Sequence, residues 1–438
     1  MLAPLYTADE MHAAEQGHDV ETMMERAGRA VADAVLRRYP DARRIAGVCG
    51  KGANGGDGRI ALRVLGEAGR ETSEDVAGAD VVIDALFGTG FRGAPREEAA
   101  REIERINAAA APVVAVDLPS GVDASTGEIG GAVVDADVTV TMHGPKVGLV
   151  VAPGRFHAGE VEVADIGLEQ GATQHRFVTA EILQLVPRKR AQDTKYSVGS
   201  VLVVGGSPGM TGAVCLSAEA AFRADVGYVA VATPAASLPV VEARLLEAVK
   251  APLERVDELA KRASAVAVGP GLGRGDEARA LVRRLLAELP VPMVVDADAL
   301  FELEPSAWPA PRVLTPHAGE LSRLLEQDSA WVDAHRLEAV RAAVERYRCI
   351  VLLKGVDTIV GAPGEGMLVS AAGTPALAAA GTGDVLTGVV AAFLAKGVEA
   401  RLAAAAAAFA HGRAAELVPY QRGVVASDVI AALPRALS

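Results

Sequence analysis

Short runs of consecutive apolar residues alternate along the chain with longer segments of helical spacing. In the first 170 residues, the apolar runs are 45–49, 80–88, 112–121 and 136–142. Because these runs are continuous rather than alternating, they are typical of strands buried on both faces, as in a parallel sheet covered by helices. The segment 58–69 has helical spacing and stops at a glycine, so it predicts a helix between the first two strands.

The beginning of the chain also shows helical signals. Residues 7–10 read Thr-Ala-Asp-Glu, a capping box in which the Thr hydroxyl and the Glu carboxylate satisfy free helix N–H groups. A helical stripe follows, formed by Met23, Met24, Ala27, Val31, Ala34 and Val35.

The pattern weakens around 165–195, where the chain is polar, contains glycines and is locally basic, and we place a domain boundary after residue 172. A second set of strand-like runs follows, at 200–206, 228–234, 265–271, 292–298, 312–317 and 349–355. A helix is predicted at 210–224, and the chain is mostly helical from Asp384 onward. The expected fold is therefore α/β, with two three-layer domains (1–172 and 173–438) that each hold a mainly parallel sheet, the first Rossmann-like.

Composition narrows the class of protein. Half of the 438 residues are hydrophobic and the net charge is −13, which disfavours nucleic acid or an anionic membrane as a partner. The three cysteines have neither disulfide nor zinc spacing, which fits a reducing cytoplasm. The N-terminus does not resemble a signal peptide, and the run 402–410 is too short to span a bilayer.

The charge is unevenly distributed. Residues 1–170 carry a net −12 and the remainder a net −1. A domain without a large negative field is the better host for a polyphosphate, so a nucleotide is expected in the second half. A drift of surface charge without functional meaning explains this feature equally well.

The stretch GKGANGGDG, residues 50–58, lies between the first strand and the first long helix. This position directs free backbone N–H groups and the positive end of a helix dipole at a ligand, and the glycines allow positive φ and leave room for that ligand. The stretch lacks the GK[ST] of a P-loop and the register of a dinucleotide-binding GxGxxG. Taken alone, it fits a tight structural turn at least as well.

Three further strand ends carry oxygen-rich or Gly-rich turns, at 84–93, 117–121 and 143–146. In an open parallel sheet these ends meet in one crevice. Asn54, Asp84 and Ser120 are candidate oxygen ligands for a monovalent or alkaline-earth cation, and Asp117 is a candidate general base. Alternatively, Asp84 caps its own turn and Ser120 only shapes a Pro-Ser-Gly turn.

The stretch GTGD, residues 381–384, opens a helix in the second half. Its glycines and the helix N-terminus form a site for a phosphoryl group, and Asp384 is placed to take a proton from an attacking hydroxyl. Asp384 could instead be only an N-cap. Lys354 follows a strand and is a candidate phosphate ligand. His317, in a strand-end turn, is either a ligand contact or a buried structural histidine.

The motifs GKGANGGDG, DALFGTGFRG and DLPSGVDASTG together resemble the NAD(P)H-hydrate epimerase family, the YjeF N-terminal domain, over about residues 1–170. The resemblance implies a potassium ion at Asn54, Asp84 and Ser120. It implies a set of substrate contacts at Ala53, Asn54, Gly55, Gly56, Asp57, Gly88, Thr89, Gly90, Phe91, Arg92, Gly93, Ala94 and Asp117. Ala53 departs from the family, which has a second Asn there, so only a backbone contact is retained at this position.

The motifs VLVVGGSPGMTGA, GPGLG, VVDADAL, TPHAGEL and AAAGTGDVLTG resemble the ADP-dependent NAD(P)H-hydrate dehydratase family, which has a ribokinase-like fold, from about residue 176 to the end. The resemblance implies substrate contacts at Ala213, Gly273, His317 and Asp384. It implies ADP contacts at Lys354, Gly355, Val356, Asp357, Thr358, Thr374, Pro375, Ala376, Leu377, Ala378, Ala379, Ala380, Gly381, Thr382 and Gly383. Ala380 replaces a family glycine.

Together the resemblances imply an enzyme that repairs hydrated NADH and NADPH in the cytoplasm. The first domain would epimerise the C6 hydroxyl with K⁺ bound and Asp117 transferring protons. The second would use ADP with Mg²⁺, and Asp384 as the base, to dehydrate the S epimer. The expected partners are NADHX, NADPHX and ADP, with no nucleic acid or membrane, and the chain is expected to form a homo-oligomer. The alternative is a vitamin or sugar kinase fused to a ligand-binding or assembly domain.

Overall fold

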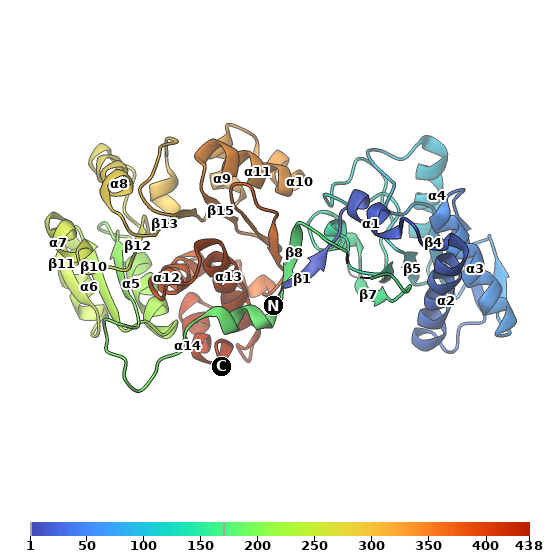
Figure 1. Ribbon diagram of the computed structural model, residues 1–438, viewed down its shortest axis with the longest axis horizontal. Coiled ribbons are helices and arrows are strands. Elements are labelled where there is room, and N and C mark those ends of the chain that lie inside the picture. Colours follow the sequence, from blue (N-terminus) through green and yellow to red (C-terminus); the bar gives the residue numbers. More distant parts are fainter. Residues whose placement is uncertain (1, 170) are drawn as a thin grey trace. The chain divides into compact units, whose positions relative to one another are not determined.

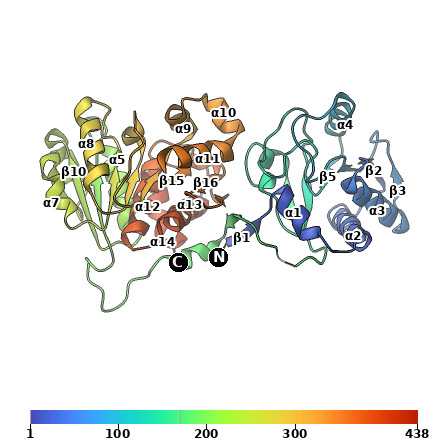
Figure 2. The ribbon, with the colours of Figure 1, turned by 45° about the horizontal axis from the view of Figure 1, so that its top comes forward.

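The computed structural model describes residues 2–169 and 171–438, and the chain divides into two compact units. The N-terminal unit consists of Pro4–Arg176 and Asp333–Arg336, and the C-terminal unit consists of Phe177–Val332 and Leu337–Ser438 with the start of the chain. Figures 1 and 2 show the elements of each unit from two directions.

The N-terminal unit is built on a six-stranded sheet in the order β3-β2-β4-β5-β6-β7, in which every neighbouring pair is parallel. The strands are β2 (Arg44–Cys49), β3 (Glu71–Ser73), β4 (Val81–Ala85), β5 (Val113–Val116), β6 (Val138–Met142) and β7 (Glu160–Ala164). The helices are α1 (Ala8–Glu15), α2 (Val20–Arg38), α3 (Ala53–Glu67) and α4 (Glu97–Asn107).

Helices cover both faces of this sheet. Ile83 of β4 is buried in the cluster that α2 and α3 form with one face, whereas Val82 is buried with Ile103 and Ile106 of α4 on the other. Successive side chains of a strand point to opposite faces, so both faces need apolar residues. This explains the continuous apolar run at 80–85.

The C-terminal unit contains most of an eleven-stranded sheet with the order β1-β8-β17-β16-β15-β14-β13-β12-β9-β10-β11. Its strands from β15 to β11 along this order are parallel, and β15, β16 and β17 pair antiparallel. The strands are β1 (Leu2–Leu5), β8 (His175–Val178), β9 (Ser200–Val204), β10 (Tyr228–Thr233), β11 (Val249–Pro252), β12 (Ala265–Val268), β13 (Met293–Val295), β14 (Arg312–Leu314), β15 (Ile350–Leu353), β16 (Thr358–Gly361) and β17 (Leu368–Ser370).

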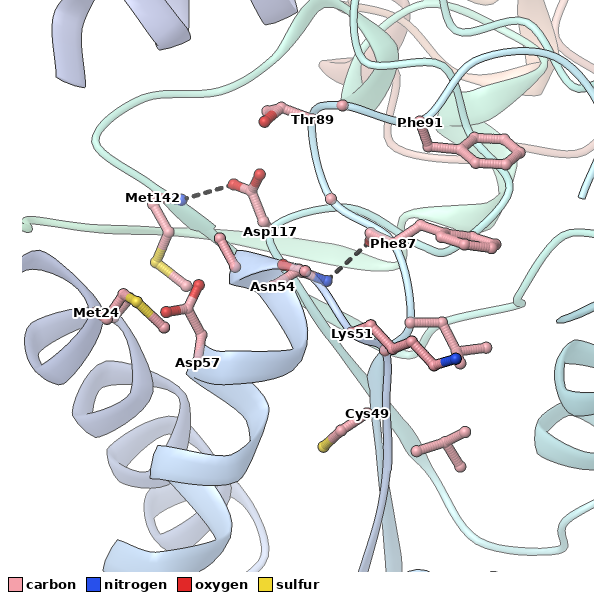
Figure 3. Close-up of a pocket in the computed structure, with 18 of the residues that line it drawn as sticks. Met24, Cys49, Lys51, Asn54, Asp57, Phe87, Thr89, Phe91, Asp117 and Met142 are labelled. Carbon is pink, nitrogen blue, oxygen red and sulfur yellow. Dashed lines mark hydrogen bonds between the residues drawn. The ribbon is translucent and has the colours of Figure 1, made fainter. Parts of the chain in front are cut away.

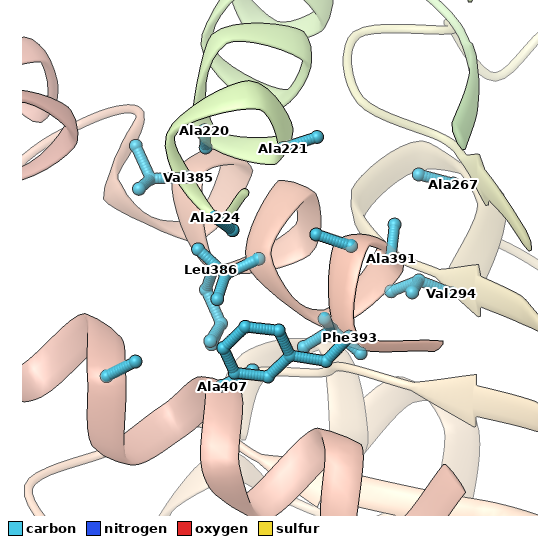
Figure 4. Packing of buried hydrophobic residues seen from close by; sticks show 14 of the residues in the cluster. Ala220, Ala221, Ala224, Ala267, Val294, Val385, Leu386, Ala391, Phe393 and Ala407 are labelled. Atoms are coloured by element: carbon cyan, nitrogen blue, oxygen red, sulfur yellow. The ribbon is translucent and has the colours of Figure 1, made fainter. Parts of the chain in front are cut away.

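Helices also lie on both sides of this sheet (Figure 1). They are α5 (Thr211–Arg223), α6 (Leu238–Arg244), α7 (Val256–Ala260), α8 (Asp276–Glu288), α9 (Ala318–Leu325), α10 (Ser329–Ala334), α11 (Arg336–Tyr347), α12 (Thr382–Ala395), α13 (Ala400–Glu416) and α14 (Ala426–Ala436). The α12 helix is almost wholly buried and contacts α5, α13 and the strands β9, β12 and β13. Figure 4 shows its Leu386 and Phe393 in one buried cluster with Ala220 and Ala221 of α5, Ala224 directly after that helix, and Ala407 of α13. Such small side chains allow neighbouring helices to pack closely.

The predicted class of fold is confirmed, and each predicted strand is present, although most end one to five residues earlier than the apolar runs. The prediction for the first long helix was wrong at its start, because α3 begins at Ala53 rather than at residue 58. The strands that were not predicted are β1, β3, β7, β8, β11, β16 and β17. The β3 residues are all exposed, so this edge strand has no apolar run. No helix in the described part of the chain is long and apolar enough to cross a membrane.

Candidate active sites

The glycines of residues 50–58 serve close packing rather than unusual backbone angles. None of the glycines in this stretch has a positive φ, so that part of our interpretation was wrong. A Cβ at Gly55 would lie 1.9 Å from the Gly50 carbonyl oxygen, and one at Gly58 would lie 2.4 Å from the Ala85 Cβ. The first turns of α3 therefore press directly against the ends of β2 and β4, with Asn54 and Asp57 carried on the helix.

Asn54, Asp84 and Ser120 come together around the backbone of Phe87. Asp84 is fully buried and accepts hydrogen bonds from the Ser120 N–H (2.8 Å) and hydroxyl (2.6 Å). The Asn54 amide donates to the Phe87 carbonyl (2.8 Å), and the Phe87 N–H donates to the Ser120 hydroxyl (2.9 Å). Burial raises the pKa of Asp84 to about 6.

The donor set of this cluster fits a monovalent cation. It holds one carboxylate together with amide, hydroxyl and carbonyl oxygens, which are hard ligands. No basic side chain is hydrogen-bonded to Asp84 within the described residues, so a cation would compensate a carboxylate that burial otherwise disfavours.

Asp117 follows β5 in a left-handed conformation, with φ of 68°. Its Oδ1 accepts hydrogen bonds from the Lys146 ammonium (2.5 Å), the Thr141 hydroxyl (3.1 Å) and the Met142 N–H (3.1 Å). The Lys146 side chain is completely buried. A residue other than glycine at such a φ is held there by its surroundings and is common at functional sites. Here those surroundings are a buried ion pair beyond the ends of β5 and β6.

A cavity of about 1350 Å³ opens over these strand ends. Asp57, Asp117, Met24 and Met142 project into it (Figure 3). Most of the predicted substrate contacts line it, namely Ala53, Asn54, Asp57, Gly88, Thr89, Gly90, Phe91, Arg92, Ala94 and Asp117. Asp84 and Ser120 lie beneath it, since both are fully buried.

Three predicted contacts do not line this cavity in the described structure. Gly55 packs on the Gly50 carbonyl and Gly56 on Met24, whereas Gly93 has a positive φ of 76° in the turn after Arg92. Phe87 and Phe91 stack with their ring centroids 4.6 Å apart, which stiffens the loop between them.

In the C-terminal unit, the stretch GTGD forms the beginning of α12. Gly381 has a left-handed φ of 89°, and a Cβ there would lie 2.6 Å from Leu216. The Thr382 hydroxyl donates to the carbonyls of Leu377 (2.8 Å) and Ala379 (2.9 Å), which fixes the loop before the helix. In the described part of the chain, the N–H groups of Gly383 and Asp384 have no hydrogen-bond partner. They are available to an anion.

Asp384 faces a group of charged side chains from three strand ends. The Lys354 ammonium lies 2.8 Å from Asp296 and 3.7 Å from Glu320. A Cβ at Gly383 would lie 3.5 Å from that ammonium, so Lys354 lies beside the start of α12. Burial and the charge of Asp296 raise the pKa of Asp384 to about 7 despite the opposing effect of Lys354. A carboxyl with this pKa can exchange a proton near neutral pH.

The other predicted substrate residues of this unit occupy neighbouring turns. His317 caps α9: its Nδ1 accepts from the Gly319 N–H (3.0 Å), and its side chain is 56% exposed. A buried structural histidine is therefore excluded. The Gly273 N–H donates to Asp298 (2.9 Å), and Ala213 lies against Gly271 of the same turn.

The predicted nucleotide contacts form two loops. Residues 354–358 connect β15 to β16, with Val356 exposed and Asp357 buried. Residues 374–383 contain a 3-10 turn at Pro375–Leu377 and then lead into α12. The contact between Lys354 and Gly383 brings the two loops together at one point.

The sequence analysis gave no functional role to Lys146, Glu15, Asp296 or Glu320. Lys146 ends the turn 143–146 that was predicted to reach the crevice, and Asp296 lies near the end of the predicted strand 292–298, so the position of each was a usable signal. Glu15 ends α1 and has no such signal, yet it lines the cavity of the N-terminal unit.

Comparison with known proteins covers both units. The family model described as NAD(P)H-hydrate dehydratase matches residues 201–435, and that of the YjeF-related protein N-terminus matches residues 20–73 and 67–148. The "Bifunctional NAD(P)H-hydrate repair enzyme Nnr" of Moorella thermoacetica is 38% identical, with 95% of this chain and 92% of that protein covered. The Escherichia coli protein of the same name is 33% identical over 94% of this chain and 88% of that protein.

A solved structure is similar to the C-terminal unit. The ADP/ATP-dependent NAD(P)H-hydrate dehydratase of Bacillus subtilis, co-crystallised with ATP and Mg²⁺, is 28% identical with a TM-score of 0.55. The similarity covers 59% of this chain and 96% of that one. Because its relatives match nearly the whole chain, and family models match both of its units, this protein belongs to the family of bifunctional NAD(P)H-hydrate repair enzymes.

Proposed function

We propose that the N-terminal unit interconverts the R and S epimers of hydrated NADH and NADPH, and that the C-terminal unit dehydrates the S epimer with ADP, releasing AMP and phosphate. The functional boundary is placed after residue 172. The observation that carries this assignment is the start of α12, where two unpaired backbone amides lie together with the side chains of Asp384 and Lys354. The unit that holds them resembles a dehydratase co-crystallised with ATP and Mg²⁺.

In the C-terminal unit, hydroxide at C6 is a poor leaving group, whereas phosphate is a good one. Asp384 takes the proton of the C6 hydroxyl as that oxygen attacks the β-phosphorus of ADP. The Gly383 and Asp384 amides and the dipole of α12 offset the charge that develops on the phosphoryl group. The loops 354–358 and 374–383 hold the nucleotide, and Mg²⁺ accompanies its phosphates.

In the N-terminal unit, Asp117 transfers protons at the C6 hydroxyl. The three hydrogen bonds to its Oδ1, one of them from the Lys146 ammonium, orient the carboxylate. Its Oδ2 has no hydrogen bond in the described structure and lies at the cavity. That oxygen is the one placed to receive a proton.

The Asn54, Asp84 and Ser120 cluster is the proposed K⁺ site. When bound, the cation supplies positive charge that compensates Asp84 and holds the Phe87 carbonyl in place. Asn54, Asp84 and Ser120 then hold the 88–91 loop in one conformation for the substrate.

Exchange of K⁺ for choline at constant ionic strength is expected to lower the epimerisation rate at least about tenfold, since a misplaced binding loop costs catalysis steeply. Dehydration of pure S epimer in the same buffers is the internal control. Equal epimerisation rates in the two salts would contradict the cation site.

The overall activity is tested with a mixture of R and S NADHX. With ADP and Mg²⁺, we expect absorbance at 340 nm to rise until both epimers are consumed. A stable phosphorylated product without NADH would instead support the small-molecule kinase. If only the S epimer is converted to NADH, and the R epimer is consumed no faster than it epimerises spontaneously, the N-terminal unit does not have its proposed activity.

A cytoplasmic location and a homo-oligomeric state are the remaining parts of this proposal. The location is supported by the three cysteines, none of which forms a disulfide within the described residues. Sedimentation of the purified protein measures the oligomeric state directly.

A further inference from the structure

Asp57 is a buried carboxyl without a partner. It lies in the second turn of α3, it is 9% exposed, and its Oδ1 has no hydrogen bond among the described residues. Leaving a buried polar group unpaired costs a protein stability. A group kept in this state at the wall of a cavity requires an explanation beyond the fold.

Asp117 enters the same cavity in a different state. Its Oδ1 is tied to Lys146, Thr141 and Met142, whereas Asp57 receives no hydrogen bond from any of them. Figure 3 shows the two carboxyl groups projecting from different elements, with Met24 and Met142 beside Asp57. Of these two carboxyls, Asp117 has a buried ionic partner, whereas Asp57 lies among apolar side chains.

The charges around Asp57 favour its protonated form. Burial, followed by the charges of Asp117 and Glu15, raises the pKa of Asp57 to about 7. The pKa of Glu15 is itself raised by burial and by Asp117, and is lowered by Lys146 and His12. The Lys146 ammonium, which lines the same cavity, is hydrogen-bonded to Asp117 rather than to Asp57. Near neutral pH, one carboxyl can then give a proton while the other accepts one.

We propose that Asp57 is a second catalytic residue of the epimerisation, which donates a proton to the departing C6 hydroxyl while Asp117 takes a proton from the water that adds to the opposite face of C6. This inference rests on the proposed function of the N-terminal unit and specifies how its site inverts C6.

The steps balance. The Asp57 proton passes to the C6 hydroxyl, the C6–O bond breaks, and water leaves as the lone pair of N1 forms an N1=C6 double bond. Water from solvent then adds to C6 from the other side, the electron pair returns to N1, and Asp117 takes the extra proton. The pair of carboxyls holds one proton before and after. Reaction of the opposite epimer, or exchange with solvent, restores the starting state.

This route predicts that the C6 oxygen is exchanged at every inversion. Pure R epimer is incubated with the full-length protein in H₂¹⁸O without ADP, so that dehydration does not proceed, and the product S epimer is analysed by mass spectrometry. One solvent oxygen per inversion is expected, after subtraction of the reaction without protein. Inversion that retains the original oxygen indicates opening of the C6–N1 bond and overturns the proposal.

The second test is Asp57→Asn, which keeps the shape of the side chain but cannot donate a carboxylic proton. The kcat of epimerisation is expected to fall about 10²-fold or more with little change in KM, the usual range for loss of a general acid. In the wild-type protein the rate should decline as the pH rises through about 7, because Asp57 loses its proton, and this decline should disappear in the variant. Dehydration of pure S epimer by the same sample reports its folding.

The matched control is Asp33→Asn, which makes the same change at an exposed position of α2 and should leave both activities unchanged. The outcomes distinguish the proposed function of the unit from the proposed role of Asp57. If the wild-type protein does not invert R epimer above the spontaneous rate, the proposed function of this unit fails. If it does, and Asp57→Asn inverts at the same kcat, only the role of Asp57 is refuted.

Discussion

Replacement of Asp384 by asparagine is expected to lower the kcat of ADP-dependent dehydration by about 10³-fold, because Asp384 is the carboxylate that lies in the first turn of α12, beside the unpaired amides, and accepts the hydroxyl proton. Such a loss corresponds to about 4 kcal/mol of transition-state stabilisation. It is measured as NADH formation at 340 nm from pure S epimer at saturating ADP. Binding of ADP, followed by calorimetry, should persist, since the loops that hold the nucleotide are unchanged.

The raised pKa of Asp384 also predicts how the dehydration rate and the stability change with pH. As a base, Asp384 must be ionised, so the wild-type rate should rise with pH through about 7, and this rise should be absent in Asp384→Asn. Its folded-state pKa is raised, so its contribution to stability is greatest in acid and is lost as the pH rises through about 7. Asp384→Asn should therefore unfold at a higher temperature than the wild type at pH 8, with the ligand-free proteins compared.

Asp257→Asn, a change at a side chain that is 60% exposed in the same unit, serves as the control and should retain full activity. Dehydration by Asp384→Asn within about threefold of the wild type would exclude Asp384 as the base. A variant that is inactive but also fails to bind ADP would point to a structural role instead.

The parts of the two sites that were predictable from sequence are those fixed by the direction of strands. An apolar run followed by Asp or Gly marks the carboxyl end of a buried parallel strand, and such ends share one edge of a sheet. Asp384 was identified differently, from GTGD at the start of a predicted helix, whereas Asp117 was found from the direction of its strand. The same rule reached Lys354 but not its partner Asp296, because an ion pair between two strand ends depends on the order of strands in the sheet, which a linear pattern does not give.

Other features depended on contacts that no local pattern encodes. The glycines at 55 and 58 were interpreted as part of a ligand-binding loop or a tight turn, yet they lie in α3, where they let the helix approach Gly50 and Ala85. His317 read as a buried group or a ligand, and its ring caps α9 through a bond two residues along the chain. Glu15 reaches the cavity only because α1 ends there, and helix ends are the least regular part of a sequence pattern.

Lys146→Met is expected to have the second large effect, on stability as well as on epimerisation. The side chain is completely buried and donates to Asp117 (2.5 Å), to the Thr141 hydroxyl (3.0 Å) and to the Met142 carbonyl (2.7 Å). Methionine fills the space of the stem but leaves the Asp117 carboxylate buried without its counter-charge. Breaking one side of a buried ion pair typically costs about 3–5 kcal/mol, so the free energy of unfolding of the N-terminal unit should fall by that order.

Hydrogen exchange of peptides from β4, β5 and β6 measures this loss within the N-terminal unit. Both tryptophans of the chain, Trp308 and Trp331, lie in the C-terminal unit, so their fluorescence shows that this unit is unaffected. Dehydration of S epimer should continue while epimerisation falls about 10²-fold or more, since the Asp117 carboxylate then loses the hydrogen bond from Lys146 that orients it for proton transfer.

The double variant Lys146→Met/Asp117→Asn separates the two roles of this pair. Removing both charges eliminates the unpaired buried carboxylate. Compared with Lys146→Met, the double variant should therefore regain part of its protection from hydrogen exchange without regaining epimerisation. Arg29→Met, at an exposed arginine of α2 that does not line the cavity, controls for loss of positive charge and should change neither quantity. If Lys146→Met inverted R epimer at the wild-type rate, the ion pair would be structural only, and the oriented carboxylate on which the epimerisation mechanism depends would have to be assigned elsewhere in the cavity.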